Sequence, residues 1–184
     1  MKHLGTQYLE TDRLILRQFT IDDAELMHKN WAFDSEVTKY LTWEPHQNFE
    51  VTQAILTDWC SHYKEDSYYQ WAITLKENPH EAIGSIGVVK QIDDVIMSAH
   101  IGYCIGKTWW HLGITSEALA RIMGFFFDEV GLNRIESLHD VNNPRSGSVM
   151  KKCGMKYEGT LRQSEWSNQG VYDACYYGIL ATER

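Results

Sequence analysis

The stretch of the chain best suited to chemistry runs from Tyr103 to Ala118, YCIGKTWWHLGITSEA. It reads as a strand, a loop and the start of a helix. The first turn of a helix directs unpaired backbone N–H groups and a positive dipole end at one point, which suits a phosphate. Gly113 lets the backbone approach an anion without an intervening side chain. The stretch predicts a phosphate-binding turn; the alternative is a plain strand-to-helix turn whose glycine relieves a tight bend.

A P-loop is a second interpretation of the same stretch, because Gly106-Lys107-Thr108 matches the end of that nucleotide-binding motif. The motif needs its first glycine at position 101, which is Ile101, and Gly102 is one residue too close. Two tryptophans also separate Thr108 from the helix that a P-loop would open directly. An NTPase is therefore disfavoured.

The composition limits the partners of this chain. Its 184 residues carry 17 Lys and Arg against 25 Asp and Glu, a formal net charge of −8. This balance argues against nucleic acid, whose phosphates need a basic face, and is compatible with a cationic amine or basic peptide. No apolar run approaches the ~20 residues of a membrane span, and no secretory signal is visible, so no membrane partner is expected.

Cysteine and histidine are dispersed along the chain. The four cysteines show neither zinc nor disulfide spacing, and the eight histidines form no HExxH motif. We therefore expect free thiols, a cytoplasmic protein and no metal site.

The apolar patterns place these residues on one α+β domain spanning residues 1–184. Helices are predicted from 20 to 31, 49 to 63, 116 to 130 and 143 to 153. Strands are predicted at 13–17, 69–75, 82–91, 96–105, 134–139, 155–165 and 171–180. The three strands between 69 and 105 indicate an antiparallel meander, and the whole order indicates a mixed sheet.

In the order and spacing of several short segments, the chain resembles the Gcn5-related N-acetyltransferase (GNAT) superfamily. Within it, the chain resembles the ribosomal-protein N-acetyltransferases of the RimJ/RimL type. The resemblance covers nearly the whole chain. It implies a mostly antiparallel sheet of about seven strands, with helices on both faces and a splayed central strand pair. It also implies acetyl transfer from acetyl-CoA to a primary amine by direct attack in a ternary complex. The segments that carry it are LETDRLILR (9–17), IGY (101–103), WHLGITSEA (110–118), NPRS (143–146), GM (154–155) and EGTLR (158–162).

The resemblance further implies how acetyl-CoA is bound. The pantetheine arm would pair with the exposed edge of the splayed strand, and Asn143 would touch the pantetheine or cysteamine end. The chain departs from the family pattern at His111, Trp110 and Thr115, where relatives usually have glycine, a basic residue or Gln, and a small residue. Backbone amides survive these changes, so CoA binding is still expected. The strand edge is Tyr103, Cys104 and Ile105, and the pyrophosphate loop is His111, Leu112, Gly113, Ile114, Thr115 and Ser116.

Acetyl transfer needs a base for the amine, a donor to the thioester carbonyl and a proton for the leaving thiolate. By resemblance, the N–H of Ile105 is the carbonyl donor. Glu165 and His100 are the candidate bases or ammonium-binding groups, with Glu165 slightly favoured; the alternatives are a solvated charge and a packed strand histidine. Met150 replaces the tyrosine that many relatives use as thiol acid. Ser146 is then the candidate acid, or an ordinary first-turn serine.

The acceptor itself is not identified by the sequence. A ribosomal-protein N-terminus is the family namesake, while other members use polyamines, amino acids, antibiotics or lysine side chains. Trp31, Tyr40 and Trp43 fall where related folds line the acceptor site, although such aromatics are usually core. Resemblance and the frequency of two-fold oligomers favour a homodimer. The alternative function is a non-catalytic acyl-CoA-binding module, suggested by His100 in place of glutamate and by Met150.

Overall fold

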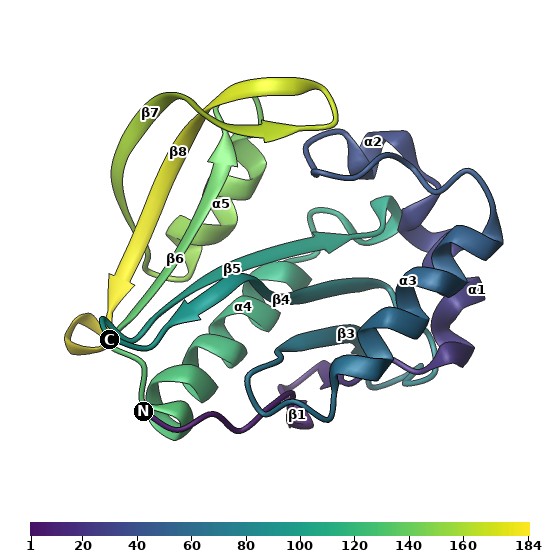
Figure 1. The fold of residues 1–184 in the computed structure, drawn as a ribbon, viewed down its shortest axis with the longest axis horizontal. Coiled ribbons are helices and arrows are strands. Elements are labelled where there is room, and N and C mark those ends of the chain that lie inside the picture. Colours follow the sequence, from purple (N-terminus) through teal and green to yellow (C-terminus); the bar gives the residue numbers. More distant parts are fainter.

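An eight-stranded open sheet forms the centre of the molecule in the computed structural model, which describes residues 1–184 (Figure 1). The strand order is β1-β2-β3-β4-β5-β6-β8-β7, and every neighbouring pair is antiparallel except β5 and β6. The predicted α+β fold is confirmed, with one two-residue strand, β1, added to the seven expected. The strands are β1 Leu9–Glu10, β2 Leu14–Arg17, β3 Gln70–Leu75, β4 Gly84–Asp93, β5 Ser98–Ile105, β6 Arg134–Asp140, β7 Lys156–Ser167 and β8 Gly170–Leu180.

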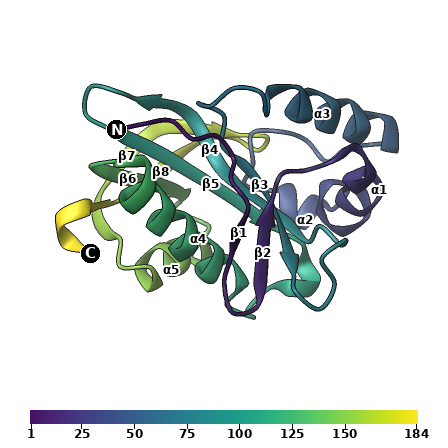
Figure 2. The same cartoon turned by 90° about the horizontal axis from the view of Figure 1, so that it is seen from below.

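Helices cover both faces of this sheet (Figure 2). One face carries α1 (Ala24–Met27), α2 (Ser35–Thr38) and α3 (Phe49–His62), and the other carries α4 (Ile114–Phe125) and α5 (Pro144–Lys152). The helix predicted from 20 to 31 is made of α1 with a 3₁₀ turn before it and a π turn after it. Helix α3 begins where the Asn48 side chain accepts a hydrogen bond from Val51 N at 3.1 Å, a regular N-cap.

Two apolar cores hold the helices to the sheet. The larger lies under α4 and includes Leu14 and Leu16, which alternate along β2 on the same face and are both fully buried. The smaller lies under α1 and α3 and includes Phe19 and Leu56. Trp31 also belongs to the smaller core. The sheet is therefore a rigid platform with a covered surface on each side.

The central strands β5 and β6 diverge along their length, as Figure 1 shows. They pair only through Ser98–His100 opposite Arg134–Glu136. One further link follows, from Ser137 Oγ to the carbonyl of Ile101 at 2.8 Å. Beyond it, β5 stays with β4 and β6 stays with β8. The expected splayed pair is thus present, and it opens a gap toward the start of α4.

Helix α4 begins at Ile114, two residues before the predicted start at Ser116. Gly113 has φ +76°, a left-handed conformation that turns the chain directly into the helix. At the other end a π turn, Phe126–Val130, continues the helix until Gly131 ends it with φ +82°. The predicted end was correct, and the earlier start brings the first helical turn closer to the gap between β5 and β6.

Candidate active site

The loop before α4 presents a run of free backbone donors. None of the N–H groups from His111 to Ser116 donates a hydrogen bond to another protein group. The first three belong to the loop, and the last three belong to the first turn of α4, where no intrahelical acceptor exists. Such a cluster at the positive end of a 12-residue helix suits a phosphate group. The structure therefore brings together all six residues of the predicted pyrophosphate loop.

Two residues of this loop adopt left-handed backbone conformations. Gly113 does so without strain, but His111 has φ +65° with a full side chain. His111 stands at the position where the resemblance expects glycine, so the backbone shape is kept although the residue type is not. The conformation costs His111 about 1–2 kcal/mol relative to glycine's freedom there. The loop geometry thus survives the substitution.

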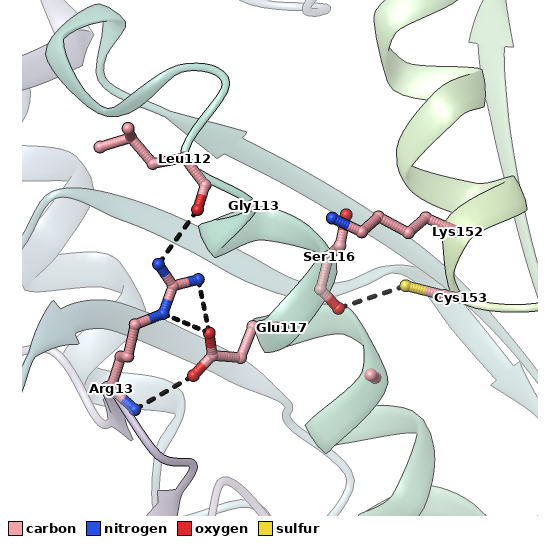
Figure 3. A pocket seen from close by; sticks show the side chains of 8 residues that line it. Arg13, Leu112, Gly113, Ser116, Glu117, Lys152 and Cys153 are labelled. Carbon is pink, nitrogen blue, oxygen red and sulfur yellow. Dashed lines mark hydrogen bonds and ion pairs between the residues drawn. The ribbon is translucent and has the colours of Figure 1, made fainter.

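A shallow hollow of about 310 Å³ lies in front of these donors (Figure 3). Lys152 reaches it from α5 and Arg13 from the turn before β2. An ideal Cβ on Gly113 would lie 3.5 Å from Lys152 Nζ and 3.7 Å from Arg13 Nη2, so both cations flank the glycine. Arg13 is held by Glu117, with Nη2 to Oε2 at 2.7 Å. The hollow therefore combines amide donors with two cations, of which Arg13 is already paired with the Glu117 carboxylate.

These two cations were missed as site residues by the sequence interpretation. Arg13 lies in the LETDR segment and Lys152 near the end of α5, about 100 and 40 residues from Gly113 along the chain. Trp110, at the position where relatives carry a basic or Gln side chain, instead donates its indole N–H to Ile105 O at 3.0 Å. The charge absent at Trp110 is supplied from two other elements. In the sequence, the basic character of Arg13 and Lys152 is the one feature that could have indicated a place beside the loop.

The edge of β5 that faces the gap carries unused backbone groups. Gly106 N donates to Ile83 O, which fixes the alternation of the ladder between β4 and β5. The N–H groups of Tyr103 and Ile105 therefore point into the gap. The same alternation turns the backbone of Cys104 toward β4, and its Sγ lies 3.3 Å from Ser85 Oγ. Of the three predicted edge residues, two present peptide groups to a ligand in the gap.

On the α5 side, one hydroxyl pair bridges the gap. Tyr103 OH donates to Ser146 O, and Ser146 Oγ donates to Tyr103 OH, both at 3.0 Å. Burial raises the pKa of Tyr103 above its usual value, although the bond to Ser146 opposes this, so the phenol stays protonated. Asn143 occupies the N-cap position of α5, beside this pair. Ser146 is thus paired with a strand residue and is more than a first-turn serine.

On the opposite sheet face, His100 lies where the gap begins. It is 7% exposed, and its Nδ1 donates to Glu136 Oε1 at 3.3 Å. That hydrogen bond, helped by Arg134 against the effect of partial burial, lowers the pKa of Glu136 to about 2. The carboxylate therefore stays charged and orients the imidazole. The second ring nitrogen, Nε2, has no protein partner.

Glu165 is engaged by two side chains on the same face. Its Oε1 accepts from Lys90 Nζ at 2.8 Å and from Tyr176 OH at 3.0 Å. Partial burial acts to raise its pKa, but these hydrogen bonds and the charges of Lys90 and His100 outweigh burial, and the pKa is lowered. A lowered pKa makes a weaker base. Lys90, which the sequence interpretation missed, lies opposite His100 in the β4–β5 ladder.

The segment between α2 and α3, residues 39–48, forms a cover over this face beside the tip of the β7–β8 hairpin (Figure 1). Asn168, in that tip, donates to the carbonyl groups of Thr38 and Trp43 at 2.9 and 2.8 Å. Tyr40 OH donates to Asn142 O at 3.0 Å, after the end of β6. Tyr40 and Trp43 are half-buried in this cover, whereas Trp31 is fully buried in the smaller core. The structure thus separates Trp31 from the other two aromatic candidates.

Several alternatives receive no support from the geometry. Gly102 lies within β5, and Lys107 is an exposed residue that pairs with Glu36, so the P-loop match is not a phosphate loop. No group of three or more His, Cys, Asp or Glu side chains is arranged to hold a metal ion. No helix has the length and apolar character that a membrane span requires.

Comparison with known proteins agrees with this geometry. Residues 13–156 match the family model described as acetyltransferase (GNAT) domain. The chain is 34% identical over 172 residues to the uncharacterized N-acetyltransferase YoaA of Bacillus subtilis, covering 94% of this chain and 96% of YoaA. A GNAT-family acetyltransferase of Bacillus anthracis superposes with a TM-score of 0.82 at 26% identity, covering 96% of this chain and all of that one.

A more distant structure shares the fold alone. RimL, a ribosomal L7/L12 alpha-N-protein acetyltransferase in complex with coenzyme A, superposes with a TM-score of 0.82 at 20% identity. The match covers 95% of this chain and 98% of RimL. Free loop donors, an open strand edge and a family match over most of the sequence lead to one conclusion. The chain belongs to the GNAT family of acetyl-CoA-dependent N-acetyltransferases.

Proposed function

We propose that this chain, acting as one domain over residues 1–184, transfers the acetyl group of acetyl-CoA to a primary amine by direct attack in a ternary complex. The observation that carries the proposal is the continuity of unused backbone donors. They run from Tyr103 and Ile105 in the gap to residues 111–116 at the start of α4. A ligand with a pyrophosphate and an amide-bearing arm matches this sequence of donors.

The binding half of the reaction follows from these donors. The pyrophosphate lies on the loop amides, where Arg13 and Lys152 neutralise part of its charge. The amide groups of the pantetheine arm pair with Tyr103 and Ile105 as an added strand would. Asn143 and the Tyr103–Ser146 pair then lie at the thiol end.

The chemical half needs three proton or charge transfers. The base takes one proton from the ammonium, and the neutral nitrogen then attacks the thioester carbonyl carbon. The C–N bond forms and the C–S bond breaks to release the thiolate, while the nitrogen loses a second proton as it becomes an amide. The Ile105 N–H stabilises the oxyanion, and the Tyr103–Ser146 hydroxyl pair returns a proton to sulfur. Between the two candidate bases, the contacts favour His100. Its Nε2 has no protein partner, whereas Glu165 is already held by Lys90 and Tyr176.

The proposed acceptor is a protein N-terminus, with a ribosomal protein as the first class to test and small amines as the second. The net charge of −8 favours a cationic acceptor. RimL is named for acting on a ribosomal protein, and this chain shares its fold. A homodimer is proposed as the working assembly.

Release of free thiol from acetyl-CoA tests the proposal. The purified chain is mixed with acetyl-CoA and a panel of amines: peptides beginning with serine or alanine, spermidine and free lysine. We expect saturable thiol release with at least one member and none without an amine. Acetyl-CoA binding with no turnover on any amine would favour a non-catalytic acyl-CoA-binding module instead.

A further inference from the structure

Asp140, at the end of β6, is a buried carboxylate with one unused oxygen. The residue is 7% exposed. Its Oδ1 accepts from Asn142 N at 2.8 Å and from Asn142 Nδ2 at 3.0 Å, but Oδ2 accepts no hydrogen bond. No Lys, Arg or His lies within ion-pair distance of it. Among the fully buried side-chain nitrogen and oxygen atoms, Trp31 Nε1 is the only one without a hydrogen-bond partner. The unpartnered Oδ2 of Asp140 is therefore not fully buried.

The pairing of β6 with β8 shows which face Asp140 occupies. Asp140 lies opposite Ala174, and Leu138 opposite Tyr176. Cross-strand partners point to the same face. Tyr176 donates to Glu165, so Asp140, Tyr176 and Glu165 share the face that also carries His100. Tyr172 lies opposite Glu165 in the β7–β8 ladder and so shares this face.

Asp140 differs from the other carboxylates on this face because no Lys or Arg side chain pairs with it. Glu165 pairs with Lys90, and Glu136 and Glu158 pair with Arg134. A buried carboxylate without a partner is unfavourable, and a cationic ligand would remove this cost. Asp140 is therefore the carboxylate of this set that no Lys or Arg contacts.

That position lies between the cover and the gap. Asn143 N donates to Asp140 O at 2.7 Å in the turn that leads into α5, three residues before Ser146. Tyr40, from the cover, reaches Asn142, the same residue that holds Oδ1. Asp140 thus lies under the cover and close to the thiol end of the proposed cofactor path.

We infer that Oδ2 of Asp140 binds the ammonium group of the acceptor before reaction. The inference rests on the proposed function and assigns one residue of this chain to the recognition of its amine acceptor in the ammonium form. Acetylation converts the ammonium to a neutral amide. The ion pair is lost in the product, which favours product release.

The test compares Asp140→Asn with Asp173→Asn. Asparagine keeps Oδ1 for Asn142 and removes only the charge. Asp173 lies on β8 and points to the opposite face, where its Oδ1 accepts from Gln163 N, so it is a matched control. We expect Asp140→Asn to raise the KM for the acceptor about 10- to 100-fold, as for a lost charged hydrogen bond. The acetyl-CoA Kd, the melting temperature and most of kcat should stay at wild-type values.

A merely structural role would give a different pattern. The melting temperature and the acetyl-CoA affinity would then fall together with kcat. An acceptor KM that Asp140→Asn leaves unchanged, or that Asp173→Asn raises equally, overturns the inference while the enzyme class stands.

Calorimetry separates this inference from the proposed function. Spermidine and a serine peptide are titrated into the CoA-saturated protein, with the N-acetylated peptide as a blank. If the wild type turns over no amine but binds these cations, and Asp140→Asn does not, the proposed function fails and the inference holds. If neither amine binds the wild type and none is turned over, both fail.

Discussion

The two sides of the gap between β5 and β6 present different kinds of functional group. On the cofactor side the functional groups are backbone amides: Tyr103, Ile105 and residues 111–116. On the acceptor side they are ionisable side chains in two pairs, His100 with Glu136 and Lys90 with Glu165. A site made of amides depends on the path of the chain and tolerates substitutions such as His111. A site made of paired side chains depends on residue identity.

This contrast predicts where substitutions matter most. Changing a side chain on the acceptor side should affect turnover and leave cofactor affinity intact. On the cofactor side, changes that alter backbone shape or local charge should act on acetyl-CoA affinity, whereas loss of the Ser146 hydroxyl should act on turnover.

The largest effect is expected from His100→Gln. Loss of a positioned base lowers turnover by about two to four powers of ten at pH 7. Raising the pH should restore part of the rate, because more of the amine is then already neutral. Initial rates from pH 7 to 10, with the acetyl-CoA Kd measured separately, check both points. The turnover of Glu165→Gln should fall less than that of His100→Gln, since Glu165 already binds Lys90 and Tyr176.

Two further variants set the limits of this experiment. Ser146→Ala should lower turnover with no recovery at high pH, because removing protons does not help thiolate departure. Glu158→Gln is the control, since Glu158 pairs with Arg134 alone. Full activity of both His100→Gln and Glu165→Gln at pH 7 would remove the base assignment.

Gly113→Asp should act on the cofactor side alone. The new carboxylate would face the pyrophosphate, and the φ of +76° would strain any side chain. We expect the acetyl-CoA Kd to rise at least about 100-fold, from like-charge repulsion of several kcal/mol. Calorimetry measures the affinity, and circular dichroism checks the fold.

Gly131→Asp is the matched control. Gly131 has nearly the same conformation, φ +82°, beyond the far end of α4. It should suffer similar backbone strain and bind acetyl-CoA as the wild type does. Equal affinities of the Gly113 and Gly131 variants for acetyl-CoA would contradict the loop assignment.

The smallest effect concerns stability at low pH. The folded-state pKa of Glu136 is about 2, below its ordinary 4.5, so its contribution to stability is present above pH 4.5 and lost as the pH falls toward 2. We expect a loss of about 1–2 kcal/mol in the free energy of unfolding over this range, after allowance for partial exposure. Denaturant titrations at pH 5 and pH 2.5 measure it.

Glu136→Gln should flatten this pH dependence, whereas Glu77→Gln, at a residue with no ion pair, should keep it. The acetyl-CoA affinity of Glu136→Gln should equal that of the wild type. A Glu136→Gln variant that retains the full slope would show that the acid-labile pairs lie elsewhere.

The cofactor side could be largely predicted from the sequence, because turns and helix starts are local features. Gly113 and the end of α4 at Gly131 were read from neighbouring residues, and the structure moved the helix start by only two positions. The left-handed conformation of His111 was not predictable, since the residue type disfavours it.

The acceptor side could not be predicted in the same way. Lys90 and Glu165 are 75 residues apart, and their contact depends on the register of several strands. The sequence offered Glu165 and His100 as candidate bases, but it did not show that Glu165 contacts Lys90 and Tyr176 or that His100 contacts Glu136. Trp31 was grouped with Tyr40 and Trp43 by type, but tertiary packing places it in the core.

The short pairing of β5 with β6 also bears on the cooperativity of unfolding. Three residue pairs join β5 to β6, whereas seven join β4 to β5 and seven join β6 to β8. The β5–β6 junction should therefore open locally more readily than the pairing on either side of it, with the backbone amides near the gap exchanging fastest. A bound pantetheine arm would occupy the gap between β5 and β6. Bound acetyl-CoA would therefore support the junction between β5 and β6 as well as supply the acetyl group.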